Sequence, residues 1–259
     1  MIFFYHYLRR NRLLFGGFLS FVVIFNLALL MGIYLFNTSP LFREASPSWM
    51  GRKGLSILSM AEFSFIFFML PLMISIFSPL SDKKVYRICT TWKYVLLCTS
   101  IPLLLIIPAV IPAVYLYMGV IPFTSILKLG LTLFFTGILL TAIYFFTCSL
   151  CSDSCVSIVV TYLVFLSLIS GIVLMNPVIE WVADPSLIIQ ATLLLNPFIS
   201  IASSINMDIL RMDPLYSLST IGVLQFHYPE PLHFWLVYGV IYFGLLTLQI
   251  KFLKRFWFT

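Results

Sequence analysis

The sequence predicts an all-α integral membrane protein with six transmembrane helices and an external re-entrant helical segment between the fifth and sixth spans. Of its 259 residues, 61% are hydrophobic and only 9% are charged, whereas roughly 25% of the residues in a soluble domain are charged. Too few polar side chains remain to cover a surface that faces water. The uncharged runs reach the length that a helix needs to cross a bilayer, about 20 residues, and they lack the short alternating segments of a transmembrane β-barrel.

The long uncharged runs belong to a single transmembrane domain that covers residues 1–259. We expect the spans near residues 13–36, 56–80, 94–117, 124–147, 156–176 and 233–253, with residues 1–12 before them and an external region at 177–232. Three arginines precede the first span, as they would in a secretory signal peptide. The apolar run continues to about Phe36 without a small-residue cleavage pattern, which indicates a retained anchor.

The positions of the basic residues predict that both termini are cytoplasmic, because Lys and Arg accumulate on that side of a membrane. The cytoplasmic segments then hold ten basic residues: Arg9, Arg10, Arg12, Lys83, Lys84, Arg87, Lys93, Lys251, Lys254 and Arg255. The opposite side holds five: Arg43, Arg52, Lys53, Lys128 and Arg211. The net charge of +6 therefore reflects topology and does not indicate nucleic-acid binding. All five tryptophans lie at predicted span ends or in adjoining loops, as in an aromatic belt.

The segment Pro185–Met207 is apolar enough to be a seventh span, but two observations argue against it. A seventh crossing would place the basic residues of the C-terminus outside, against the charge rule. Asn196-Pro197 also interrupts the segment, and a proline removes a backbone donor and breaks a helix. We therefore expect two short helices that dip into the outer leaflet within the external region 177–232.

No sequence pattern points to catalysis on this chain. The chain has no phosphate-binding Gly-x4-Gly-Lys-Ser/Thr loop, no His-Glu-x2-His helix and no Gly-x-Ser-x-Gly turn. We predict no catalytic residue and no cofactor. Glu62, about two turns into the second span, is the one clear candidate for an intramembrane polar site, since an acid at that depth is costly. The alternative is that Glu62 lies near the headgroups or pairs with Lys128.

Two clusters have ligand-like spacing, yet neither predicts a metal site. His227, Glu230 and His233 are three residues apart, but neighbouring prolines prevent the helix that would align them. Interfacial polar residues beside the sixth span are the simpler interpretation. The second cluster lacks an evident fourth ligand and consists of Cys148, Cys151 and Cys155.

Three passages together resemble the membrane subunits of type-2 ABC exporters. Residues 78–84, Ser-Pro-Leu-Ser-Asp-Lys-Lys, followed by Lys93, are similar to that family's passage after the second span. Residues 137–150 are similar to its fourth span, which ends in a Ser-Leu turn. Residues 194–198, Leu-Leu-Asn-Pro-Phe, continuing to Arg211, match its external re-entrant passage. The chain departs from the family in lacking a Glu-rich stretch before Ser78, which shortens the cytoplasmic loop.

The resemblance implies a permease in the plasma membrane, with a bacterial inner membrane expected, and a separate ATP-binding subunit that holds ATP and Mg. It implies a second permease subunit, identical or homologous, and membrane lipid around both. Residues 1–12 would form an interfacial helix, and Asn196 and Pro197 would belong to an external gate. A coupling helix against the ATPase would contain Asp82, Lys83, Lys84 and Arg87.

A polytopic membrane protein of another class is the alternative: an ion-driven carrier, an assembly factor or a lipid-modifying enzyme. A carrier should have paired charges at mid-bilayer, and none is clearly placed. A lipid-modifying enzyme should show clustered histidines and carboxylates, and only residues 227–233 suggest this. A pathway lined by Phe, Leu and Ile suits lipids, amphipathic drugs, peptides or haem equally well.

Overall fold

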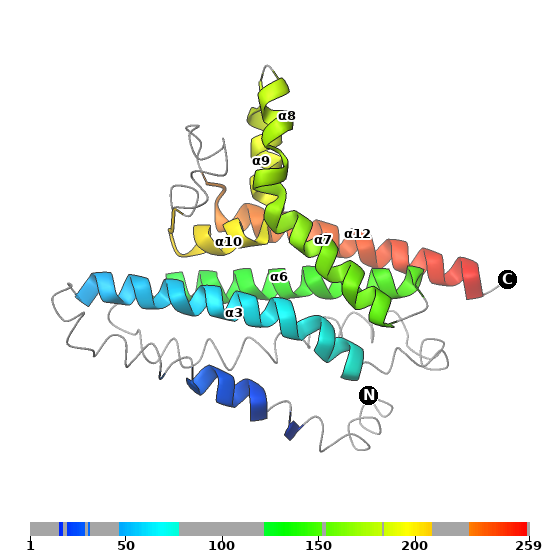
Figure 1. Cartoon of the computed structure of the whole chain (residues 1–259), viewed down its shortest axis with the longest axis horizontal. Helices are drawn as coiled ribbons and strands as arrows, with labels where there is room; N and C mark the ends of the chain where they lie inside the picture. The colour runs from blue at the N-terminus through cyan, green and yellow to red at the C-terminus, as the bar shows by residue number, and fades with distance from the viewer. Residues whose placement is uncertain are drawn as a thin grey trace.

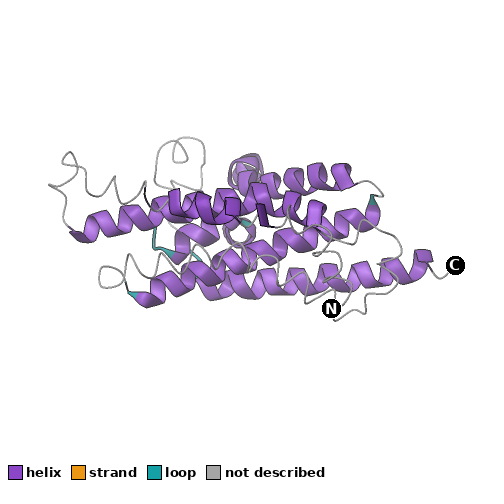
Figure 2. Cartoon of the chain, turned by 90° about the horizontal axis from the view of Figure 1, so that it is seen from below, coloured by secondary structure: helices purple, strands orange, loops and turns teal. Residues whose placement is uncertain are grey.

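All regular structure in the described part of the chain is helical (Figures 1 and 2). The computed structural model describes residues 16–17, 20–28, 31, 47–77, 122–151, 154–182, 184–208 and 228–257. Within them lie α3 (Pro47–Phe77), α6 (Phe123–Leu150), α7 (Ser154–Leu174), α8 (Asn176–Trp181), α9 (Ser186–Leu195), α10 (Pro197–Ser204) and α12 (Pro231–Trp257).

Three of these helices are long and apolar enough to cross a membrane, and a fourth crossing is reached only if α9 and α10 count as one bent span. The three are Phe123–Cys148, Cys155–Leu174 and Pro231–Gln249. Each coincides with a predicted span, because uncharged runs longer than 18 residues leave few alternatives to a helix in lipid. The membrane-helix character of the chain is thus confirmed.

The first three predicted spans are described less completely. The second, predicted near 56–80, overlaps α3, which begins at Pro47 and ends at Phe77 and whose apolar part is Ser59–Leu72. Only part of the first span is described, with residues 20–28 helical. The third predicted span, near 94–117, lies outside the described residues.

Helix α6 is the centre of the described bundle, and α3, α7, α10 and α12 all pack against it (Figure 1). Two thirds of its most apolar 18-residue window is buried, against about a fifth of the corresponding windows of α7 and α12. Leu133, Leu139 and Leu140 are among its buried side chains. A membrane helix apolar on all sides is thereby covered by protein rather than lipid.

Aromatic contacts hold α3 against its neighbours. The rings of Phe67 and Phe165 stack with centroids 5.4 Å apart, and Phe63 lies 6.0 Å from Phe198 of α10. On its other side, Phe65 stacks on Phe25 at 4.3 Å. Because such pairs gain stability beyond their buried area, they fix α3 between α7, α10 and the helical residues 20–28.

The contacts also give the directions of the helices. Phe63 and Phe67 meet Phe165, while the backbone of Phe68 accepts a hydrogen bond from Tyr162, so α3 and α7 are antiparallel. Along α6 and α12 the paired positions increase together, from Thr132 with Trp235 to Phe145 with Gln249. Helices α3, α6 and α12 therefore run one way, and α7 runs back (Figure 1).

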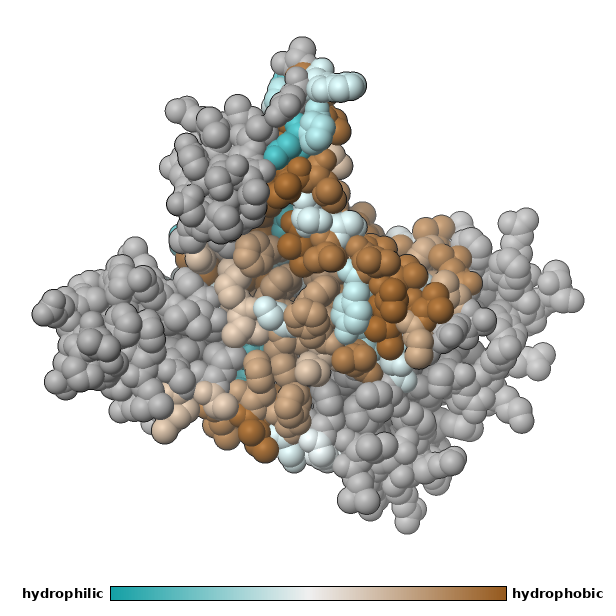
Figure 3. All heavy atoms as spheres, in the orientation of Figure 1, coloured by the Kyte–Doolittle hydropathy of each residue, from teal (hydrophilic) through white to brown (hydrophobic). Residues whose placement is uncertain are grey.

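Apolar side chains cover much of the outer surface of this bundle (Figure 3). Exposed examples lie on α7, on the α8–α9 projection and along α12: Leu163, Leu174, Trp181, Leu187, Val240 and Phe243. A soluble monomer rarely exposes so much contiguous apolar surface. Lipid is the solvent that accommodates it.

Candidate functional site at the end of the bundle

The chain turns sharply at Asn196, between α9 and α10. The two helices meet at 83°, and Figure 1 shows α9 standing across the bundle while α10 lies along it. The Oδ1 atom of Asn196 accepts hydrogen bonds from the backbone N–H groups of Phe198 at 2.9 Å and Ile199 at 3.1 Å. Pro197 occupies the first position of α10, where its missing N–H is not needed. The predicted helix break at Asn196-Pro197 is confirmed.

The same side chain ties the turn to α7. The Nδ2 atom of Asn196 donates to the backbone carbonyl of Ile169 at 2.7 Å, and the whole residue is buried. Helix α10 in turn contacts α3, α6, α7 and α12. The turn therefore lets a short helix pack along the bundle, in contact with four other helices.

The end of α10 is closed by local hydrogen bonds. The backbone N–H of Met207 donates to the carbonyl of Ala202 at 2.9 Å, and Asn206 takes a positive φ of 55°. Asparagine tolerates this left-handed conformation better than most residues. The Ser203 hydroxyl donates to the carbonyl of Pro229 at 2.7 Å, which holds α10 against the segment that leads into α12.

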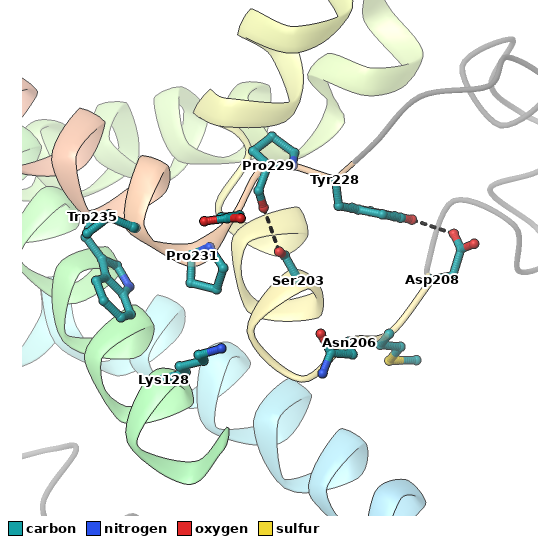
Figure 4. A pocket seen from close by; sticks show the side chains of 11 residues that line it. Lys128, Ser203, Asn206, Asp208, Tyr228, Pro229, Pro231 and Trp235 are labelled. Carbon is teal, nitrogen blue, oxygen red and sulfur yellow. Dashed lines mark hydrogen bonds between the residues drawn. The ribbon is translucent and has the colours of Figure 1, made fainter. Parts of the chain in front are cut away.

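A cavity of about 560 Å³ opens between the end of α10 and the starts of α6 and α12 (Figure 4). Its volume falls in the range typical of small-molecule sites, about 300–1,000 Å³. The lining residues come from three parts of the chain: Lys128; Ser203, Asn206, Met207 and Asp208; Tyr228, Pro229, Glu230, Pro231, Leu232 and Trp235. The cavity thus lies at one end of two candidate membrane helices.

Polar contacts fix the walls of this cavity. The Tyr228 hydroxyl donates to Oδ1 of Asp208 at 2.6 Å. Nε1 of Trp235 donates to the Thr132 hydroxyl at 3.0 Å, and that hydroxyl donates to the carbonyl of Lys128 at 2.8 Å. The side chains of Lys128 and Glu230 are exposed.

Glu62 lies on α3, away from this cavity, and is only 1% exposed. Neither carboxyl oxygen has a hydrogen-bond partner among the described residues. The alternative in which Glu62 pairs with Lys128 is therefore wrong, since Lys128 is exposed and lines the cavity. A buried carboxyl without a partner is costly, and a role for Glu62 as an intramembrane polar site stays a prediction.

The other residues predicted from the sequence either form no common site or lie outside the described residues. Glu230 and His233 are exposed, and His227 lies outside the described residues. The three cysteines at the α6–α7 connection form no disulfide within the described part of the chain. Nowhere in the described ranges do three metal-ligating side chains come together. The coupling residues Asp82, Lys83, Lys84 and Arg87 also lie outside the described residues.

Sequence reasoning missed the cavity because its walls are far apart along the chain. In the sequence, Lys128 is a basic residue on the predicted outer side, Asp208 lies within the passage from residue 194 to Arg211, and Trp235 belongs to the predicted aromatic belt. Only the fold brings them together around one space. The available signal was that each lies at a helix end on the same predicted side of the membrane.

No protein-family model, curated protein or solved structure matches the chain.

Proposed function

We propose that this chain is the permease subunit of an ATP-binding-cassette exporter, which forms half of a translocation path driven by a separate ATPase. The observation that most favours it is the sharp turn in the Leu194–Phe198 passage. The passage that resembles the family's external re-entrant region forms two short helices at 83°, anchored by Asn196. The path would be completed by a second permease subunit in the plasma membrane, and in bacteria this is the inner membrane.

The helix directions support six spans with the re-entrant segment. Helix α7 runs back along α6, and α12 runs with α6. If α9 and α10 together crossed the membrane, α12 would start at the opposite end and run against α6. The parallel run of α3 and α6 agrees with a return span between them, as the sequence predicts near 94–117.

The proposed mechanism couples ATP to the permease through the segment from Asp82 to Arg87. Closure of the two ATPases would push this segment and shift the balance between inward- and outward-open states. An effector shifts such a balance only if it contacts the two states differently. Because α10 touches α3, α6, α7 and α12, any relative movement of these helices would reach the external gate at Asn196 and Pro197.

The test is purification of the complex from its native membranes, with Mg-ATP hydrolysis as the readout. We expect the wild-type chain to retain an ATPase subunit. Lys83→Glu combined with Lys84→Glu should reduce the retained hydrolysis about tenfold or more, because reversed charges at a docking segment weaken binding by at least about 1.4 kcal/mol. The matched control is Lys251→Glu with Lys254→Glu, the same charge change on the same predicted side.

Two results would contradict the proposal. One is a purified complex without any ATP-hydrolysing partner. The other is an equal loss of hydrolysis in both double variants, which would indicate a general effect of charge on the protein rather than a specific docking segment.

An ion-driven carrier is the second candidate, and the burial of Glu62 favours it. A membrane-embedded acid is a common element of proton pathways. The chain alone, reconstituted in vesicles, would then carry protons under an imposed potential, and Glu62→Gln would abolish this. An exporter permease without its ATPase should show no such flux in either form.

A further inference from the structure

We propose that the cavity at the ends of α6, α10 and α12 binds a zwitterionic phosphate headgroup of the phosphoethanolamine class, supplied by a membrane lipid. The lining of this cavity of about 560 Å³ includes the cationic side chain of Lys128 and the exposed carboxylate of Glu230. A purely anionic or cationic ligand would leave charges of one sign uncompensated. A ligand that has a phosphate and an ammonium group compensates the charges of both signs.

The phosphate side of the site is Lys128. Its side chain reaches from α6 toward the space beside Ser203, Asn206 and Pro231 (Figure 4). Among the described residues no carboxylate lies within ion-pair distance of its ammonium group. The lysine is therefore available to bind a phosphate, as a point charge with three donors.

The ammonium side of the site is formed by Glu230 and the rings of Tyr228 and Trp235. Glu230 is exposed and lines the cavity just before α12. The Tyr228 ring is held beside the cavity by the hydrogen bond that its hydroxyl donates to Asp208 at 2.6 Å. Carboxylates beside Tyr and Trp rings suit an organic ammonium group, because the rings attract cations.

The walls of the cavity are already held in place without a ligand. Ser203 is bonded to Pro229, Asn206 is set in a left-handed turn, and Trp235 is bonded to Thr132. A binding site that is preformed loses less conformational freedom when the ligand arrives. The hydrogen bonds therefore favour a specific site over a surface depression.

The lining and the position of the cavity favour a lipid as the source of the headgroup. Apolar residues line the cavity beside the charged groups, namely Met207, Pro229, Pro231 and Leu232. The cavity lies at the starts of two helices long and apolar enough to span a membrane, and Trp235 is a residue type enriched at the headgroup level. A water-soluble phosphoethanolamine would satisfy the charges but not the apolar lining.

The test is a titration of the purified full-length chain in detergent, followed by native mass spectrometry. The ligands are phosphatidylethanolamine, phosphatidylglycerol and free phosphoethanolamine. We expect phosphatidylethanolamine to bind more tightly than phosphatidylglycerol. Lys128→Gln should weaken both lipids about tenfold, as expected when a charge-assisted contact is lost, whereas Lys128→Arg should retain binding.

Glu230→Gln gives the sharper result. It should weaken phosphatidylethanolamine, leave phosphatidylglycerol unchanged or improved, and so bring the ratio of the two affinities to about one. Asp184→Asn removes an exposed carboxylate outside the cavity and should change nothing. The experiment uses no ATPase, so its outcome is independent of the proposed transport function.

Equal binding of the two lipids by the wild-type chain, or wild-type selectivity in Glu230→Gln, would overturn the site. Free phosphoethanolamine that competes as well as the lipid would support the zwitterion chemistry and overturn the lipid as its source.

Discussion

At the scale of single residues, the side chain of Asn196 connects two helices and its backbone ends a third. Its Oδ1 atom satisfies two N–H groups at the start of α10, and its Nδ2 atom donates to the carbonyl of Ile169 in α7. The residue also ends α9. Its full burial means that water cannot replace these bonds.

Asn196→Ala should lower the free energy of unfolding by about 2–3 kcal/mol, because it removes a helix cap and a buried donor. Asn196→Ser, which retains a capping oxygen, should lose less. Thermal unfolding in detergent measures both. The control is Gln190→Ala on the exposed side of α9, and a loss no greater than in this control would show that the turn does not depend on the asparagine.

Glu62 presents the opposite situation at the residue scale, because its buried carboxyl forms no hydrogen bond with any described residue. Glu62→Met should raise the free energy of unfolding by about 1–3 kcal/mol, since it removes an unsatisfied carboxyl while filling similar space. The control is Ser64→Met on the exposed face of α3. Activity that falls while stability rises would show that the carboxyl is retained for function. A destabilised Glu62→Met variant would mean that the carboxyl has a partner.

At the scale of elements, the start of α9 depends on a carboxylate outside the membrane-length helices. Asp184 is exposed, and its Oδ1 atom accepts a hydrogen bond from the backbone N–H of Ser186 at 3.1 Å. Hydrogen bonds from the Ser186 side chain and backbone lower the pKa of Asp184. The contribution of such a group to stability is present above its unfolded pKa and is lost as the pH falls through its folded pKa.

We therefore expect the first turn of α9 to open more readily as the pH falls below about 4, the ordinary pKa of aspartate. Protection factors from amide hydrogen exchange at residues 186–189 measure this opening. Asp184→Asn retains an acceptor but cannot titrate, so its protection should not change over this range. The same pH dependence in both proteins would assign the effect to other groups.

At the scale of the whole molecule, α7 connects two ends of the bundle that should lie on opposite sides of the membrane. Cys155 is exposed at the start of α7, and Asp184 is exposed beyond its far end. In a chain whose only cysteine is Cys155, a membrane-impermeant maleimide should react only after the cells are permeabilised. In a cysteine-free chain with Asp184→Cys, it should react in intact cells.

Labelling of both positions from one side would contradict a membrane-spanning α7. Labelling of Cys155 alone in intact cells would reverse the orientation. A reporter placed after residue 259 that reports an external position would contradict six spans.

Hydropathy and charge by themselves determined that the chain is a helical membrane protein, and they located α6, α7 and α12 nearly to their ends. Backbone groups in lipid must be satisfied within the helix, so a long apolar run dictates its own structure. Local chemistry also determined the break at Asn196-Pro197, because a proline inside a helix removes a backbone hydrogen bond and kinks or ends the helix.

Only the tertiary structure decided what the side chains at the helix ends do. It separated Lys128 from Glu62, buried the carboxyl beyond the reach of any described donor, and gathered residues 128, 203–208 and 228–235 around one cavity. Hydropathy registers how a residue partitions between water and lipid. It contains no information on which distant segments meet, because that depends on how α10 packs against α3, α6, α7 and α12.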